Sequence, residues 1–170
     1  MKSLFAVIVS VVFLVSTLSA QSNEDKEKIK IYNPFADAGK DIEQAVKTAK
    51  EQNKHVLLQV GGNWCPWCIK IHKFIAANAF LDSIVKADYV FLLVNYSKEN
   101  RNYDILKKLE YPQRFGFPVF VVLDGDGKRL HTQDSGFLEK DESYDLKKIK
   151  TFLLTWNKEA LNPEKYEDKK

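Results

Sequence analysis

Two kinds of apolar pattern alternate along the chain and predict strands and helices in turn. The apolar runs at 56–60, 89–96 and 118–123 are short and almost uninterrupted, which is typical of strands covered on both faces. The run at 89–96 is apolar almost throughout, so we expect it to be a central parallel strand. A weaker pattern at 29–32 predicts a short edge strand.

Four other segments predict helices. Their apolar residues recur at spacings of three and four, and the segments are 41–53, 66–80, 103–109 and 145–157. The last residues, 162–170, are strongly charged and are expected to be frayed.

The turn Asp124-Gly125-Asp126-Gly127 is a strong hairpin signal, so residues 129–132 are expected to return antiparallel. Strands that alternate with helices imply a parallel sheet. The pattern therefore predicts an α/β fold with a central mixed sheet. Parallel core strands and an antiparallel C-terminal hairpin would be flanked by helices.

The N-terminus is typical of an export signal. A lysine precedes an apolar core at 4–15, and small polar residues follow. This core is shorter than the roughly 20 residues of a membrane span. We expect a signal peptide at 1–20 and one domain at 21–170 with its core at about 41–157. The expected location is the periplasm or the extracellular space; an uncleaved anchor is the alternative.

Charge and size limit the classes of partner. The chain has 170 residues, with 26 Lys and Arg against 23 Asp and Glu in mixed order. This balance indicates neither nucleic acid nor an acidic membrane as partner. We expect a monomer that is not inserted in a membrane once the signal is cleaved. A domain of this size needs no disulfide in order to fold.

The two cysteines of the chain lie three apart, in Trp64-Cys65-Pro66-Trp67-Cys68. The pair stands between a predicted strand and a predicted helix. A C-x-x-C at that place in a βαβ pattern is typical of a thiol–disulfide redox site. Exported proteins that use disulfides for stability usually carry several cysteines, and none is left over here.

The predicted helix start explains the chemistry of the pair. Free N–H groups and the helix dipole favour a negative charge there, so Cys65 is expected to be an exposed nucleophilic thiolate. Cys68 lies one turn later and would resolve the mixed disulfide. Lys70, His72 and Lys73 would favour the thiolate further, unless they form only a solvated helix face.

The residues around the cysteines are candidates for substrate binding. Pro66 suits the first helical turn, because its missing N–H would have no partner there. Trp64 and Trp67 would offer an apolar surface to an unfolded or extended substrate. We expect Trp67 to be exposed, whereas for Trp64 packing beneath the site is an equal alternative.

This layout resembles the thioredoxin superfamily over about 41–156, and most of all the small secreted thioredoxin-like proteins. The pentapeptide matches the family's W-C-x-x-C, and Phe117-Pro118 falls where the family places a cis-proline. Gly136 matches a family glycine after the hairpin. The resemblance implies the thioredoxin fold, with Cys65 as nucleophile and Cys68 as resolving thiol.

The resemblance also implies a substrate groove. In the family the cis-proline loop lies against the cysteines, and the residue before the proline offers backbone groups to an extended substrate. The expected substrate-binding residues are Trp64, Pro66, Trp67, Phe117 and Pro118. A proline in the first place between the cysteines is similar to the more oxidising members. Gln59 stands where many thioredoxins carry a buried Asp, and a neutral amide cannot act as a base.

The sequence thus predicts a thiol–disulfide oxidoreductase that exchanges its disulfide with cysteines of exported proteins. Its direction stays open, as does a membrane redox partner, and no cofactor is implied. One alternative is a thioredoxin-fold binding or scaffold domain with an inert disulfide. A zinc site at Cys65, Cys68 and His72 would lack a fourth protein ligand, so no metal is expected.

Overall fold

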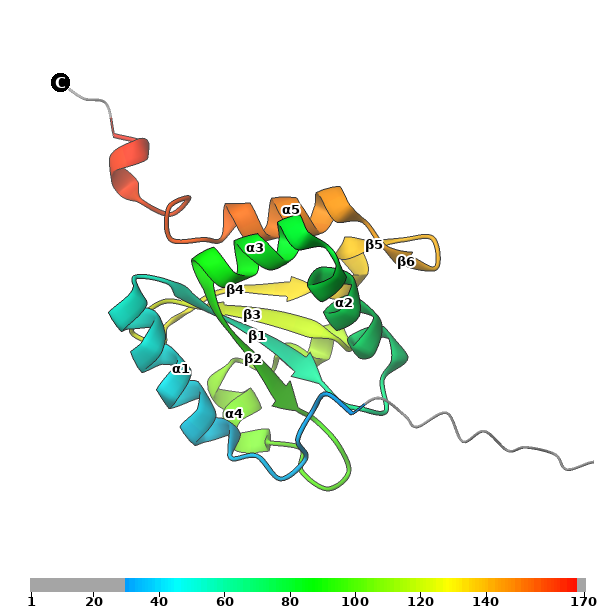
Figure 1. Ribbon diagram of the computed structural model, residues 1–170. Coiled ribbons are helices and arrows are strands. Elements are labelled where there is room, and N and C mark those ends of the chain that lie inside the picture. Colours follow the sequence, from blue (N-terminus) through cyan, green and yellow to red (C-terminus); the bar gives the residue numbers. More distant parts are fainter. Residues whose placement is uncertain (1–29, 168–170) are drawn as a thin grey trace, which may run out of the picture.

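The computed structural model describes residues 30–167, which form a four-stranded sheet with helices on both faces and a small separate hairpin (Figure 1). The expected signal peptide at 1–20 lies outside the described residues. None of the helices within residues 30–167 is long and apolar enough to cross a bilayer.

The sheet has four strands in the order β2-β1-β3-β4. They are β1 (His55–Gly61), β2 (Tyr89–Asn95), β3 (Val119–Leu123) and β4 (Arg129–Asp134). β1 runs parallel to β2, and β3 runs antiparallel to both β1 and β4. The mixed α/β fold with an antiparallel hairpin is therefore as predicted, although β3 pairs antiparallel with β1 rather than continuing the parallel order.

The prediction that 89–96 is a central strand was wrong. β2 lies at the edge of the described sheet, while β1 and β3 are its fully buried central strands. Helices α1 (Ala38–Gln52) and α3 (Ala79–Asp88) both contact β2. Its apolar residues therefore reflect helices on both faces, not strands on both sides.

The helix predicted at 66–80 is broken at Asn78. Its backbone is extended, its N–H donates to the Ile75 carbonyl, and its side chain accepts from the Leu81 N–H. Asn78 therefore ends α2 (Pro66–Ala77) and begins α3, a helix that the sequence pattern did not predict.

The remaining elements are short. The helices α4 (Tyr103–Lys108) and α5 (Leu146–Thr155) were predicted, and Asp145 caps the start of α5. The pattern missed the small hairpin of β5 (Glu139–Lys140) and β6 (Ser143–Tyr144). Three 3-10 turns complete the described chain: η1 (Pro112–Phe115), η2 (Ser135–Leu138) and η3 (Pro163–Lys165). The last of these forms where frayed chain was expected.

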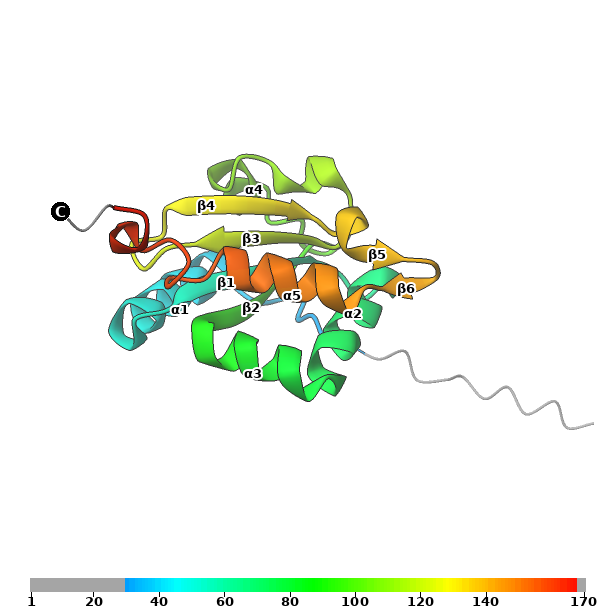
Figure 2. The same ribbon diagram turned by 90° about the horizontal axis from the view of Figure 1, so that it is seen from above.

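Each face of the sheet has its own hydrophobic core. α1 and α4 cover one face, whereas α2, α3 and α5 cover the other (Figure 2). Alternate residues of β1 supply both cores: Leu57 faces the second group of helices, while Val56 and Leu58 face the first.

The strand expected at 29–32 is absent from residues 30–32. The backbone N–H groups of Ile31 and Tyr32 donate to Asn63 Oδ1 at 2.8 and 2.9 Å, and Asn63 Nδ2 donates to the Tyr32 carbonyl at 2.7 Å. The Asn63 side chain thus satisfies the backbone hydrogen bonds that a neighbouring strand would otherwise make. It fixes Tyr32 beside the loop that carries the cysteines.

Candidate active site

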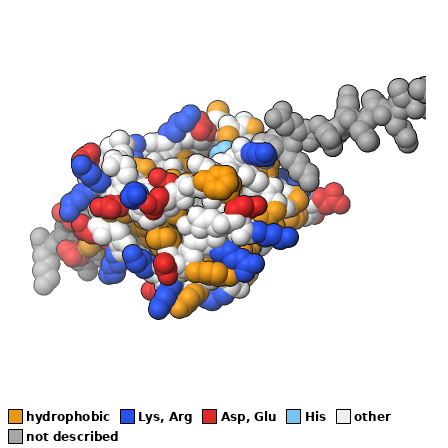
Figure 3. Space-filling model, turned by 90° about the horizontal axis from the view of Figure 1, so that it is seen from below, with side chains coloured by type: hydrophobic (Ala, Val, Ile, Leu, Met, Phe, Trp, Pro, Cys, Tyr) orange, Lys and Arg blue, Asp and Glu red, His pale blue; other side chains and the backbone are white. Residues whose placement is uncertain are grey.

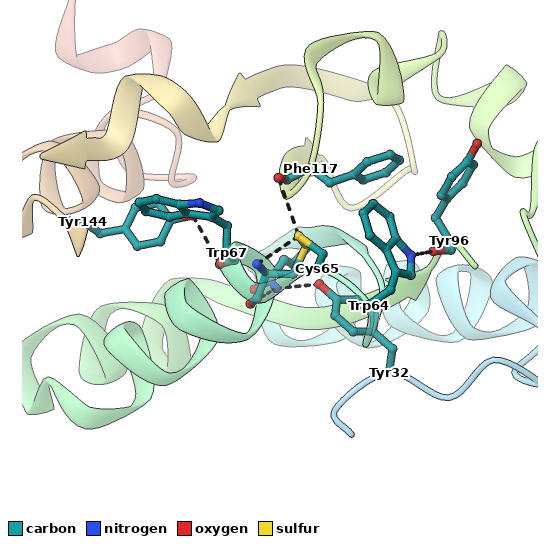
Figure 4. Close-up of a disulfide and its surroundings, with 9 residues drawn as sticks. Tyr32, Trp64, Cys65, Trp67, Tyr96, Phe117 and Tyr144 are labelled. Atoms are coloured by element: carbon teal, nitrogen blue, oxygen red, sulfur yellow. Dashed lines mark hydrogen bonds between the residues drawn. A yellow bond between two sulfur atoms is a disulfide. The ribbon is translucent and has the colours of Figure 1, made fainter. Parts of the chain in front are cut away.

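The two cysteines form a disulfide at the N-terminus of α2, with their Cα atoms 5.3 Å apart (Figure 4). Cys65 is the N-cap residue, and its Sγ accepts the N–H of Cys68 at 3.2 Å. Pro66 occupies the first helical turn, which contains no acidic residue. The sulfur of Cys65 therefore lies where a free N–H group and the helix dipole stabilise a negative charge.

The expectation of an exposed nucleophile was wrong. Cys65 is 4% exposed and Cys68 is fully buried. Phe117 lies on one side of the disulfide and Tyr32 on the other, and the Phe117 carbonyl oxygen lies 3.7 Å from Cys65 Sγ (Figure 4). A disulfide sulfur has no proton, so this is a close contact that becomes a possible hydrogen bond only after reduction.

The Phe117–Pro118 peptide bond is cis, as the resemblance implied. Pro118 is buried and Phe117 is half-buried. This loop turns the carbonyl of Phe117 toward Cys65. An extended chain that binds here would therefore meet a backbone acceptor next to the sulfur.

Trp64 begins a row of aromatic side chains beside the disulfide. Its ring meets Phe117 edge to face at 5.4 Å, and Phe117 stacks on Tyr96 at 4.7 Å. The indole N–H of Trp64 donates to the Tyr96 carbonyl at 2.6 Å. Trp64 nevertheless remains 55% exposed. We call Trp64, Phe117 and Tyr96 the aromatic row.

Trp67 is half-buried whereas Trp64 is exposed, so the expectation that Trp67 is the more accessible tryptophan was wrong. Its ring packs edge to face against Tyr144 at 5.3 Å, and Lys70 Nζ lies 4.2 Å from the ring centre. Tyr144 belongs to the hairpin that the sequence pattern missed. Trp67 is therefore held largely by packing.

The cations after the motif do not surround the disulfide. Lys70 donates to the Glu142 carbonyl at 2.6 Å, and His72 stacks on Phe91. Burial lowers the pKa of His72, which favours its neutral form. Lys73 is exposed on the helix surface. The helix terminus remains the best supported source of thiolate stabilisation.

Two buried polar residues complete the site. Gln59 is fully buried, and its Nε2 donates to the Tyr32 hydroxyl at 2.6 Å and to the Cys68 carbonyl at 3.0 Å. Burial raises the pKa of Tyr32 well above its ordinary value, so this phenol stays protonated. Sequence reasoning found Gln59 by comparison with the family pattern. It missed Tyr32, which no motif marks.

A cavity of about 730 Å³ opens on the other side of Trp64. Its walls include Phe35 and Tyr96, which are aromatic, and Lys98 and Arg101, which are cationic. The cavity does not reach the cysteines, but it shares Trp64 with them. A polypeptide bound at the disulfide would therefore find an adjoining hollow large enough for a bulky side chain.

The described part of the chain offers no cluster of three or more His, Cys, Asp or Glu residues that could hold a metal ion. The face seen in Figure 3 carries interspersed cationic and anionic side chains. That face shows no continuous basic patch of the kind that binds a nucleic acid backbone.

A family model and the structure of a disulphide isomerase agree with this architecture. Residues 42–148 match the family model of the thioredoxin-like domain. A disulphide isomerase from Xylella fastidiosa Temecula1 has a similar structure, with a TM-score of 0.66 and 24% identity over 75% of this chain and 96% of that one. The C-terminal domain of DsbD from Neisseria meningitidis, in its oxidised form, gives a TM-score of 0.49 and 19% identity, over 69% of this chain and 95% of that one. A search of curated protein sequences found no match.

Proposed function

This chain belongs to the thioredoxin-like family, and on that premise we propose that it is a thiol–disulfide oxidoreductase acting on cysteines of exported proteins. The observation that carries the proposal is the position of Cys65 at the N-cap of α2, where its sulfur accepts the Cys68 N–H. The same N–H would stabilise a thiolate there. The apolar N-terminal segment at 4–15 supports export.

The reaction needs only sulfur chemistry. In the oxidising direction a substrate thiolate attacks Cys65 Sγ, the Cys65–Cys68 bond breaks, and Cys68 leaves with the electron pair. A second substrate thiolate then attacks the substrate sulfur of the mixed disulfide and releases Cys65. The two substrate thiols are oxidised to a disulfide, and the protein disulfide is reduced to two thiols. The two protons that the substrate thiols lose are taken up by Cys65 and Cys68. The reducing direction is the reverse.

Substrate recognition in this proposal uses the aromatic row and the Phe117 carbonyl. Exposed Trp64 gives an apolar contact that tolerates many sequences, as an enzyme acting on unfolded chains requires. The Phe117 carbonyl would accept a backbone N–H from an extended substrate. Because Cys65 is almost covered, the substrate must approach along the edge that exposed Pro66 and Trp64 border.

A second function is favoured by the burial of the disulfide. Both sulfurs are largely covered, which suits a binding or scaffold domain with an inert disulfide. Closing so short a loop stabilises a fold by only about 2 kcal/mol in the chain-entropy treatment. Structural benefit alone is therefore a weak reason for the pair.

Trapping of mixed disulfides distinguishes the two functions. The Cys68→Ala variant retains the proposed nucleophile but cannot resolve an intermediate, so it should form a reductant-sensitive adduct with an unfolded polypeptide that contains a disulfide. The Cys65→Ser variant retains only the buried thiol and should form none. A folded Cys68→Ala protein without adducts would favour the inert disulfide.

A further inference from the structure

We propose that Tyr32 is a positioning residue for the resolving thiol, with its phenol O–H donating a hydrogen bond to the Cys68 thiolate that forms when the disulfide opens. The inference rests on the proposed function. In this proposal the buried phenol stabilises the negative charge of the Cys68 thiolate, at a site where the neutral Gln59 cannot act as a base.

The phenol and the sulfur border the same small space. A Cβ added to Gly61 would lie 2.5 Å from Cys68 Sγ and 2.8 Å from Tyr32 Oη. Tyr32 also forms one packed cluster with Cys65 and Cys68 and is only 3% exposed. In the oxidised protein no hydrogen bond joins the phenol to Cys68. Reduction frees the sulfur from Cys65 and leaves the phenol as a polar neighbour.

The orientation of Gln59 leaves the proton of Tyr32 free to donate. The Cys68 carbonyl can only accept, so the group of Gln59 that faces it must be the amide nitrogen. That nitrogen also donates to Tyr32 Oη at 2.6 Å. The phenol oxygen therefore accepts from Gln59, and among the described residues its own proton has no acceptor.

The protein fixes the phenol in this place from two directions. Asn63 holds the backbone of Tyr32 through two hydrogen bonds and that of Ile31 through a third, and Gln59 holds the Tyr32 hydroxyl from β1. A donor held rigidly beside a buried anion loses little conformational freedom when that anion forms. Tyr32 does not itself give up its proton: the phenol remains intact while electrons and bonds exchange among the sulfurs.

The test is the pKa of the Cys68 thiol in the Cys65→Ser background, followed by thiolate absorbance and by the pH dependence of alkylation. A hydrogen bond to a charged group contributes about 1.5–3 kcal/mol, which corresponds to about one to two pKa units. Tyr32→Phe removes only the hydroxyl and should raise the pKa of Cys68 by that amount. Tyr89→Phe is the matched control, because Tyr89 is also buried and its hydroxyl donates to the Leu153 carbonyl.

An unchanged pKa of Cys68 in Tyr32→Phe, or an equal shift in Tyr89→Phe, would overturn the proposal. If Tyr32→Phe does not fold, the Tyr32 ring carbon Cζ is followed by NMR in the reduced wild-type protein. The chemical shift of this carbon should change as Cys68 ionises, and a chemical shift that stays constant through that titration would overturn the proposal.

These measurements are independent of turnover. A protein that exchanges no disulfide would refute the proposed function, while the pKa of Cys68 would still test the role of Tyr32. Conversely, rapid disulfide exchange together with a Cys68 pKa that is unchanged in Tyr32→Phe would refute only the role of Tyr32.

Discussion

Asn63 joins the N-terminal segment to the active-site loop, and its removal should open the site. Asn63→Ala deletes the hydrogen bonds from Ile31 N–H at 2.8 Å and Tyr32 N–H at 2.9 Å, and the bond to the Tyr32 carbonyl at 2.7 Å. At about 0.5–1.5 kcal/mol each, the three bonds sum to about 1.5–4.5 kcal/mol, and the expected loss is near the middle of that range, at about 2–3 kcal/mol. Freed backbone groups can reach water if the segment detaches, and this limits the cost.

The expected result has a global and a local part. For a domain of this size, such a loss should lower Tm by about 5–10 °C. Detachment of Tyr32 should also expose the disulfide, so a small thiol should reduce it several-fold faster. The amide protons of Ile31 and Tyr32 should lose their protection from hydrogen exchange.

Asn33→Ala is the control in the same segment. The exposed Asn33 side chain accepts only the Phe35 N–H, at 3.0 Å, and its loss should change both stability and reduction rate little. If Asn63→Ala behaves like Asn33→Ala in hydrogen exchange and reduction, Asn63 does not anchor the segment, and the account of how Tyr32 reaches the site is wrong.

Three further predictions concern the site and its support. Trp64→Ala should slow disulfide exchange with an unfolded polypeptide about tenfold relative to exchange with glutathione, while Tm hardly changes. Trp67→Ala should instead lower the free energy of unfolding by about 2–3 kcal/mol, because its ring packs on Tyr144. Equal effects of the two variants on exchange rate and on Tm would contradict their separate roles. Gly61→Ala places a methyl group 2.5 Å from Cys68 Sγ and should lower the free energy of unfolding by about 1–3 kcal/mol in denaturant titrations. Gly39→Ala, in α1, is the control and should not destabilise the protein. An unchanged stability of Gly61→Ala would refute the close packing around Cys68. Burial lowers the pKa of both His72 and His131, so as pH falls the unfolded state binds protons before the folded state does, and stability should decrease below about pH 6.5. Replacing both histidines by Gln should flatten the dependence of Tm on pH in this range. An unchanged pH dependence would refute the role of these two histidines.

The sequence predicted the features that depend on neighbouring residues. Short uninterrupted apolar runs located the strands β1, β2 and β3, the period of 3.6 located most of the helices, and Asp124-Gly125-Asp126-Gly127 located the hairpin. The C-x-x-C motif located the disulfide at a helix start. Each of these signals is local, because the residues that specify the structure are also close together in the chain.

The errors about the site involve partners far away in the sequence. Trp67 is covered by Tyr144, 77 residues later, and Cys65 is covered at Phe117, 52 residues later. Tyr32 reaches the site through Asn63, which lies 31 residues away. No local pattern contains these contacts. The exposure of a side chain and the identity of the buried polar residues at the site therefore required the structure.

The central claim is that the start of α2 stabilises a thiolate at Cys65. It is tested most directly by the pH dependence of alkylation of the single thiol in Cys68→Ala, with the unfolded chain as reference. We predict a pKa at least about one unit below the ordinary value of about 8.5, with reaction in the folded state. A thiol that titrates at the ordinary value, or that reacts only after unfolding, would contradict the account.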